Sequence, residues 1–312
     1  MIADRLDILR EVARALREGR PVVALESTLI SHGLPYPQNL DVALASEAAV
    51  REAGAAPATV AIRDGRVLVG LDRASLEALA TAPEGSVRKA ARPSLAAALD
   101  AGDWAATTVS ATMIAAHAAG IAVFATGGIG GVHRGALGRA DGSASFDISS
   151  DLEELARTPM AVVCAGPKAI LDVPATLEYL ETRGVPVVAV GQDELPGFYA
   201  RSLGVRAPSS VDDVAAAARL ASVHLGLGLG NSILLCVPVP ESDALAPEVA
   251  RAAIERAITD ADAARVAGPE LTPWLLARIA ELTDGASVRA NTALIVNNAL
   301  VAGQVASQLR AS

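Results

Sequence analysis

A lysine that follows a buried strand is the side chain in this sequence most suited to covalent chemistry. The apolar run 160–165 is followed by Gly166 and Pro167, a pattern typical of a buried strand that ends in a turn, and Lys168 comes next. Because a helical pattern begins at Leu171, we expect both desolvation and the helix dipole to disfavour the ammonium form. The free amine is the form that attacks carbonyl carbon. The same pattern also fits a surface lysine that opens a helix.

Two carboxylates, Glu26 and Asp147, are the candidates for proton transfer. Glu26 follows the apolar run 21–25, and Asp147 stands in the segment 146–151. A carboxylate directly after a buried strand is partly desolvated, which suits acid–base work. A carboxylate of this kind, taken alone, is more often a helix cap or a surface charge. Glu26 and Asp147 could form a site only if they lie close to Lys168.

The turn around Asp147 is rich in oxygen ligands. Asp147 and Asp151 flank Ser149 and Ser150, and such a set of oxygens suits a hard divalent cation. Either serine could instead cap the helix predicted over 152–157. Neither the histidine nor the cysteine spacing supports a zinc site. We expect His117 and His224 to lie on helices in structural roles, whereas His32 and His133 lie on loops with neighbouring glycines.

The segment Thr126 to Gly131 contains four glycines and could be mistaken for a dinucleotide-binding loop. Gly128 and Gly130 match the first two glycines of that fingerprint, but His133 stands at the third position and a polar turn follows. Close glycines do allow backbone N–H groups to approach an anion or a sugar. A plain tight turn is the other interpretation.

Strands and helices alternate along the chain, which predicts a largely parallel sheet covered by helices on both faces. We expect one α/β unit over residues 1–312, an antiparallel hairpin at Asp64-Gly65, an opening helix over 1–20, a helix over 40–53 capped by Asn39, and Lys89 in a loop. The other strands are predicted at 21–25, 121–125, 160–165, 185–190 and 232–237. Ligands of such sheets bind beyond the carboxyl ends of the strands, where this reading places Glu26, Thr126 and Lys168.

Composition excludes several classes of function. The net charge is −9 and aromatic residues make up 3% of the chain, so a nucleic-acid-binding face is not expected. The most apolar stretch, 220–238, contains His224 and Asn231, and it fits a helix end followed by a buried strand better than a membrane span. Cys164 and Cys236 lie in apolar runs, which predicts buried thiols and a cytoplasmic protein.

Several multi-residue motifs together resemble one known family. They are Leu-Glu-Ser-Thr-Leu-Ile-Ser-His-Gly-Leu-Pro at 25–35, Ala-Thr-Gly-Gly-Ile-Gly-Gly-Val-His-Arg at 125–134, Phe-Asp-Ile-Ser at 146–149, Ala-Gly-Pro-Lys at 165–168, Leu-Glu-Tyr-Leu-Glu-Thr at 177–182 and the segment 291–299. From about residue 21 to residue 303 the chain resembles the pseudouridine-5′-phosphate glycosidases.

The resemblance implies a three-layer α/β/α sandwich around a largely parallel, mixed sheet, a homotrimer, and a divalent cation, typically Mn²⁺. It implies cleavage of the carbon–carbon bond between uracil and ribose 5-phosphate, with Lys168 forming an imine with C1′, Glu26 as acid and base, and Asp147 as metal ligand, largely through water. The substrate contacts that it implies are Lys89, the backbone of Val109, His133, Ser149, Ser150, Asp151 and Asn291. A lysine suits this bond because the leaving carbon has no lone pair to protonate, whereas ordinary glycosidases protonate oxygen.

Departures from the family pattern leave other functions open. Ala90 to Ser94 replaces a more polar run after Lys89, Pro167 replaces a small residue, and the segment 136–144 is longer than usual. The substrate could therefore be another base or sugar phosphate, or the reaction could run towards C-glycoside synthesis. A sugar-phosphate binding protein without activity is the alternative from another class, and a nicotinamide-dependent oxidoreductase is disfavoured by the glycine loop.

Overall fold

A mixed sheet forms the centre of the molecule in the computed structural model, which describes residues 1–138, 144–266, 268 and 271–309. The described strands join in the order β1-β4-β3-β2-β7-β8-β11-β9-β10, and β6 and β5 extend from β3. Their bounds are β1 Leu6–Ile8, β2 Val22–Leu25, β3 Ala56–Arg63, β4 Arg66–Val69, β5 Arg88–Ala90, β6 Ala105–Thr107, β7 Val123–Ala125, β8 Ala161–Cys164, β9 Val187–Val190, β10 Ser209–Val211 and β11 Ile233–Cys236.

All pairings among these strands are parallel except those that β3 makes with β4 and with β6. The hairpin expected at Asp64-Gly65 joins β3 to β4, and both of its turn residues have positive φ. Because β2, β7, β8, β9 and β11 are buried along their whole length, their near-continuous apolar sequences follow from helices lying on both faces.

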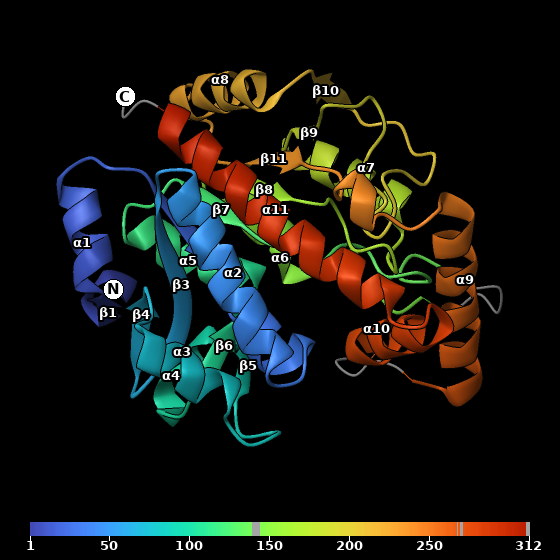
Figure 1. Cartoon of the computed structure of the whole chain (residues 1–312), viewed down its shortest axis with the longest axis horizontal. Helices are drawn as coiled ribbons and strands as arrows, with labels where there is room; N and C mark the ends of the chain where they lie inside the picture. Colours follow the sequence, from blue (N-terminus) through green and yellow to red (C-terminus); the bar gives the residue numbers. More distant parts are fainter. Residues whose placement is uncertain (139–143, 267, 269–270, 310–312) are drawn as a thin grey trace.

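Helices cover both faces of this sheet, as Figure 1 shows. The α-helices are α1 Arg10–Arg17, α2 Gln38–Glu52, α3 Arg73–Ala80, α4 Leu95–Ala101, α5 Val109–Ala118, α6 Ser150–Leu155, α7 Val173–Thr182, α8 Val214–Gly226, α9 Pro247–Ala264, α10 Leu271–Leu282 and α11 Ala286–Gln308. One apolar core packs α1, α4, α5, α6 and α7 against the sheet. A second core packs α2, α8 and α11 against the opposite face, where α2 and α11 lie side by side. The fold is the expected three-layer α/β/α sandwich.

Two expectations about the N-terminal part are wrong. Residues 1–20 do not form one helix, because Leu6–Ile8 pairs in parallel with β4 and the α-helix begins only at Arg10. Asn39 does not cap α2; it lies inside the first turn, is buried, and donates from Nδ2 to the carbonyl oxygens of Ile30 at 2.6 Å and Ala80 at 2.9 Å. Tertiary pairing outweighs local pattern in both places.

Other expectations are confirmed. Cys164 and Cys236 are free, buried thiols, and His117 and His224 lie on α5 and α8. Among the described residues, no helix is both long and apolar enough to cross a membrane. The longer segment noted at 136–144 falls mostly outside the described residues, which omit 139–143.

Candidate active site

Lys168 lies in a turn beyond the carboxyl end of β8. Gly166, with φ of +83°, turns the chain, and backbone bonds pair this turn with the glycine loop: Ile129 N donates to Gly166 O and Lys168 N donates to Ile129 O, both at 3.1 Å. The helix expected from Leu171 is present, but α7 begins two residues later, at Val173, and is capped by Asp172. The helix dipole therefore does not act directly on the Lys168 amine. Its half-buried side chain points into a cavity rather than lying on an outer helix face.

Glu26 follows β2, two strands away from β8, and two threonines hold its carboxylate. The hydroxyl of Thr28 donates to Oε2 and the hydroxyl of Thr126, at the end of β7, donates to Oε1. Both carboxylate oxygens are therefore oriented by the ends of neighbouring parallel strands. Sequence reasoning placed Thr126 at this edge but missed its contact and that of Thr28. The signal was available, because a hydroxyl residue follows each of the two strands.

One cavity of about 420 Å³ brings four of the predicted residues together. Glu26, Lys168, Lys89 and Asn291 all line it, the last from α11. Most of the remaining wall is apolar, and it is formed by Leu25, Leu29, Ile30, Ala43, Ala125, Phe198, Pro273, Leu276 and Ile295. An apolar cavity with a few convergent polar groups is typical of a small-molecule site.

Lys89 is in strand β5 and not in a loop as expected, because residues 88–90 pair in parallel with β6. Although this side chain is exposed as a whole, its pKa is lowered, chiefly by partial desolvation and next by electrostatic repulsion from the neighbouring Lys168, while Glu26 and Asp151 oppose the shift. Two amines thus face the same cavity within electrostatic reach of each other. Such a pair favours an anionic ligand between them.

His133 and Asp147 line a second cavity, of about 510 Å³. Nδ1 of His133 lies 3.9 Å from Oδ2 of Asp147, and the backbone of His133 donates to Asp147 O at 3.0 Å. Burial lowers the pKa of His133, Asp147 opposes this, and Lys168 and Lys89 lower it further. The second cavity lies close to the first, since α10 lines the first through Thr272 and Leu276 and the second through Leu271 and Leu275.

The oxygen and nitrogen donors here fit a particular kind of metal site. Among the described residues there is no group of three His, Cys, Asp or Glu side chains that could enclose a cation. Asp147 is 43% exposed, so its carboxylate can meet a hydrated ion. Mg²⁺ and similar hard cations often keep several waters and bind through one or two carboxylates. The residues present therefore fit a water-rich divalent site at Asp147.

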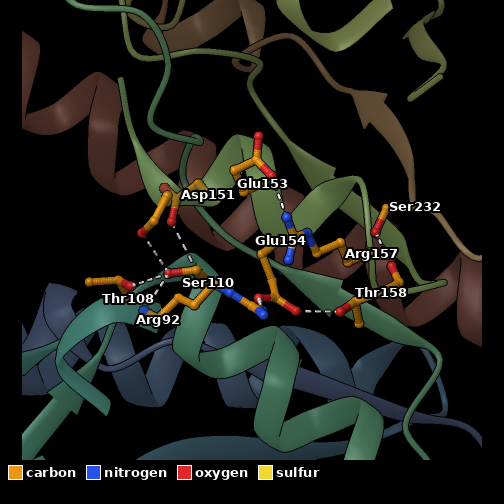
Figure 2. Close-up of polar contacts among 10 residues, drawn as sticks. Arg92, Thr108, Ser110, Asp151, Glu153, Glu154, Arg157, Thr158 and Ser232 are labelled. Carbon is orange, nitrogen blue, oxygen red and sulfur yellow. Dashed lines mark hydrogen bonds and ion pairs between the residues drawn. The ribbon is translucent and has the colours of Figure 1, made fainter. Parts of the chain in front are cut away.

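Asp151 joins the glycine loop to the start of α5, as Figure 2 shows in part. Its Oδ1 accepts from Ser110 N at 3.0 Å and its Oδ2 accepts from Gly130 N at 2.9 Å. A Cβ atom on Gly130 would collide with Ser149, whose hydroxyl accepts from Asp151 N at 3.2 Å as the N-cap of α6. The glycines of this loop serve close approach, since none of Gly127, Gly128, Gly130 and Gly131 has φ in the left-handed region.

The predicted substrate contacts divide into two groups. Val109, Ser149, Ser150 and Asp151 line neither cavity, whereas Lys89 and Asn291 line the first and His133 lines the second. The Ser150 hydroxyl lies 3.3 Å from that of Ser110, and Val109 is buried. These residues support the loop that carries the site, and their contact with substrate stays a prediction.

The departure from the family pattern after Lys89 has a structural counterpart in the Arg92 side chain. Arg92 pairs through its guanidinium with Glu154, which is 2% exposed and also accepts from Thr158 (Figure 2). The backbone N–H of Arg92 donates to Ser110 Oγ at 3.1 Å. This ion pair ties the segment after β5 to α6, and nothing in the sequence spacing indicated it.

The chain matches the family model described as indigoidine synthase A like protein over residues 11–308. It belongs to that family. The chain is 53% identical over 299 residues to a pseudouridine-5′-phosphate glycosidase of Paracoccus denitrificans, with 96% of each chain covered. It is 52% identical over 304 residues to one of Caldanaerobacter subterraneus, covering 97% of this chain and 96% of that one.

Two solved structures share the fold. A prealnumycin C-glycosynthase in complex with ribulose 5-phosphate superposes with a TM-score of 0.87 at 39% identity, covering 97% of this chain and 96% of that chain. An indigoidine synthase A-like protein from Thermotoga maritima superposes with a TM-score of 0.83 at 31% identity and the same coverage. The similarity therefore extends over nearly the whole chain in both sequence and fold.

Proposed function

We propose that this protein is a pseudouridine-5′-phosphate glycosidase, an enzyme that cleaves pseudouridine 5′-phosphate reversibly to uracil and ribose 5-phosphate. The observation that carries the proposal is that Lys168 and Glu26 line one cavity at the carboxyl edge of the sheet. The relatives that are about 50% identical over nearly the whole chain bear this name. The neighbour described with ribulose 5-phosphate is in keeping with a sugar-phosphate ligand.

The chemistry requires an amine because both partners in the bond are carbon. Nζ of Lys168 bonds to C1′ as the O4′–C1′ bond breaks and O4′ takes a proton. C5 of the base then accepts a proton. The C1′–C5 bond breaks, its electron pair restores the C5=C6 double bond of uracil, and the lone pair of Nζ forms the C=N bond of the imine with C1′. Water adds to C1′ and releases ribose 5-phosphate and the free amine.

In this scheme, Glu26 holds and moves the proton that reaches C5 of the base. Thr28 and Thr126 fix the direction of its carboxylate, so the proton is delivered from a constant position. Lys89 and His133 supply positive or hydrogen-bonding partners for the sugar phosphate, and Asn291 faces the base. We further propose that Asp147 holds Mn²⁺ or another divalent cation through water, which would supply positive charge near the phosphate.

Borohydride trapping tests the covalent step. Reduction in the presence of ribose 5-phosphate should attach the sugar to Lys168, and Lys168→Ala should lose the label while Lys89→Ala keeps it. A label on another lysine, with Lys168 unmodified, would refute the assignment. A homotrimer in the cytoplasm is part of the proposal; light scattering of the purified protein tests the trimer.

Synthesis is the second candidate reaction. The structural neighbour named a C-glycosynthase favours it, and the apolar wall of the cavity suits a planar aglycone. Incubation of uracil, ribose 5-phosphate and Mn²⁺ with the protein should yield a C-nucleotide. A protein that binds the sugar phosphate but neither makes nor cleaves the C-nucleotide would instead be the non-catalytic binding protein.

A further inference from the structure

The inner end of the cavity is formed by neighbouring residues of three strands and by two helices. Thr59 of β3, Leu25 of β2 and Ala125 of β7 stand side by side in the register of the sheet. Ser46 of α2 and Ile295 of α11 also line the cavity. Thr59 is 2% exposed and Ser46 is 3% exposed, so this end is deep, whereas Lys89 lies at the open side.

The two hydroxyls at the inner end have already used their protons. Oγ1 of Thr59 donates to Oε1 of Glu47 at 2.7 Å, and Oγ of Ser46 donates to the carbonyl oxygen of Val42 at 2.8 Å. A hydroxyl has one proton and two lone pairs. Towards a ligand, both groups are therefore acceptors only.

Glu47 fixes this polarity for Thr59. Its side chain is 6% exposed, and Oε2 accepts from the Arg51 guanidinium at 3.3 Å. Burial raises the pKa of Glu47, and the bonds from Thr59 and Arg51 oppose this by stabilising the ionised carboxylate. In that form the carboxylate has no proton to give, so the Thr59 hydroxyl is the donor in this pair. Glu47 does not itself line the cavity, so its effect on a ligand would pass through Thr59.

The proposed substrate has donors where this end needs them. A uracil linked through C5 carries N1–H and N3–H on either side of its C2 carbonyl, on the edge farthest from the carbon–carbon bond. A uracil linked through N1 has only N3–H as a donor. Resting on the proposed function, we propose that Thr59, oriented by Glu47, accepts a hydrogen bond from N1–H of the base, the donor that an N1-linked uracil lacks, and so selects for the C5-linked form.

The test measures C-nucleotide synthesis from uracil and ribose 5-phosphate in three variants at Thr59 and Glu47. Thr59→Val keeps the shape but removes the acceptor, and it should raise the KM for uracil about tenfold with a smaller change in kcat. Thr59→Ser keeps the acceptor and should stay within about threefold of wild type. Both should still form the borohydride adduct at Lys168, because the sugar site is unchanged.

Glu47→Gln tests the positioning role without altering the cavity wall. With its amide oxygen towards Arg51, the glutamine would present its NH₂ group to Thr59, whose hydroxyl would then point its proton at the ligand. We expect the KM for uracil to rise as in Thr59→Val, and the double variant to be no worse than either single one. 1-Methyluracil and 3-methyluracil each block one N–H of the base. Wild type should show different KM values for the two, and this difference in KM should be smaller in Thr59→Val.

The outcomes separate this inference from the proposed function. If wild type makes no C-nucleotide, the proposed function fails and the inference fails with it. If wild type is active and Thr59→Val keeps its KM for uracil, only the inference is overturned. Equal impairment of Thr59→Val and Thr59→Ser would overturn it as well, because it would assign the effect to packing.

Discussion

Replacing Thr126 by valine tests the proposed role of Glu26 in proton transfer and the part that Thr126 has in orienting its carboxylate. Thr126 is 4% exposed, and its hydroxyl donates to Oε1 of Glu26. Valine keeps the volume, while the backbone stays anchored through Thr126 N to Val163 O at 3.0 Å and through Asn298 Nδ2 to Thr126 O at 2.9 Å. The substitution should therefore remove one hydrogen bond and little else.

The expected loss follows from the charge on the acceptor. A hydrogen bond to a charged group contributes about 1.5–3 kcal/mol. If that energy fixes the carboxylate in the position required in the transition state, kcat should fall about 10-fold to about 100-fold. The KM should change much less, since the sugar and phosphate contacts remain.

The assay is steady-state cleavage of pseudouridine 5′-phosphate, followed by the release of uracil, in parallel with thermal unfolding. Thr126→Ser is the matched control, because it restores the hydroxyl, and it should retain most of the activity. Thr28→Val should produce a loss of the same kind at Oε2. A wild-type kcat in Thr126→Val would refute the argument that this bond orients Glu26, and so would a serine variant that is as slow as the valine variant.

Further predictions concern charge. The pKa of Lys89 is lowered, so it should lose its charge at a lower pH than an ordinary lysine, and affinity for the phosphorylated substrate should fall over that pH range. In a binding titration, Lys89→Met should show a weaker dependence of affinity on pH. Asp147→Asn should raise the Mn²⁺ concentration needed for half-maximal activity, and an unchanged requirement would count against its role. Burial raises the pKa of Glu47, so wild type loses stability as pH rises through and above the ordinary glutamate range, because Glu47 must then ionise while buried. Glu47→Gln has no carboxyl group at this position, so its unfolding free energy minus that of wild type should grow over this pH range in denaturant titrations. Arg92→Ala leaves buried Glu154 without its cation and should cost about 1–3 kcal/mol of stability, whereas Arg92→Lys should cost less.

The sequence predicted the parts of the fold that depend on local pattern. The apolar runs of β2, β8, β9 and β11 are unmistakable because both faces of these strands are covered. The short strands β1 and β5 were missed because each has only three residues and exists through pairing with a partner distant in sequence. Pairing energy of that kind leaves no periodic signal in the strand itself.

The residues at the sheet edge of the candidate site could be predicted from the sequence, but the contacts behind them could not. Because the carboxyl ends of parallel strands meet at one edge, Glu26 and Lys168 could be placed together from sequence. Glu47 bonds to Thr59 and Arg92 pairs with Glu154. In each pair the two residues lie on different elements, so only the tertiary structure brings them together. The effect of a helix dipole on Lys168 was predicted because the helical pattern begins at Leu171. In the structure the turn after β8 is longer, and α7 begins at Val173.

The helix α11 contributes Asn291 and Ile295 to the cavity and holds the carbonyl oxygens of Thr126 and Gly127 through Asn298. Its residues are made last among those that build the site, more than 110 positions after Lys168. During synthesis on the ribosome, the growing chain can form its sheet long before the pocket has a complete wall. We therefore expect the cavity to gain its complete wall only after α11 has emerged and docked.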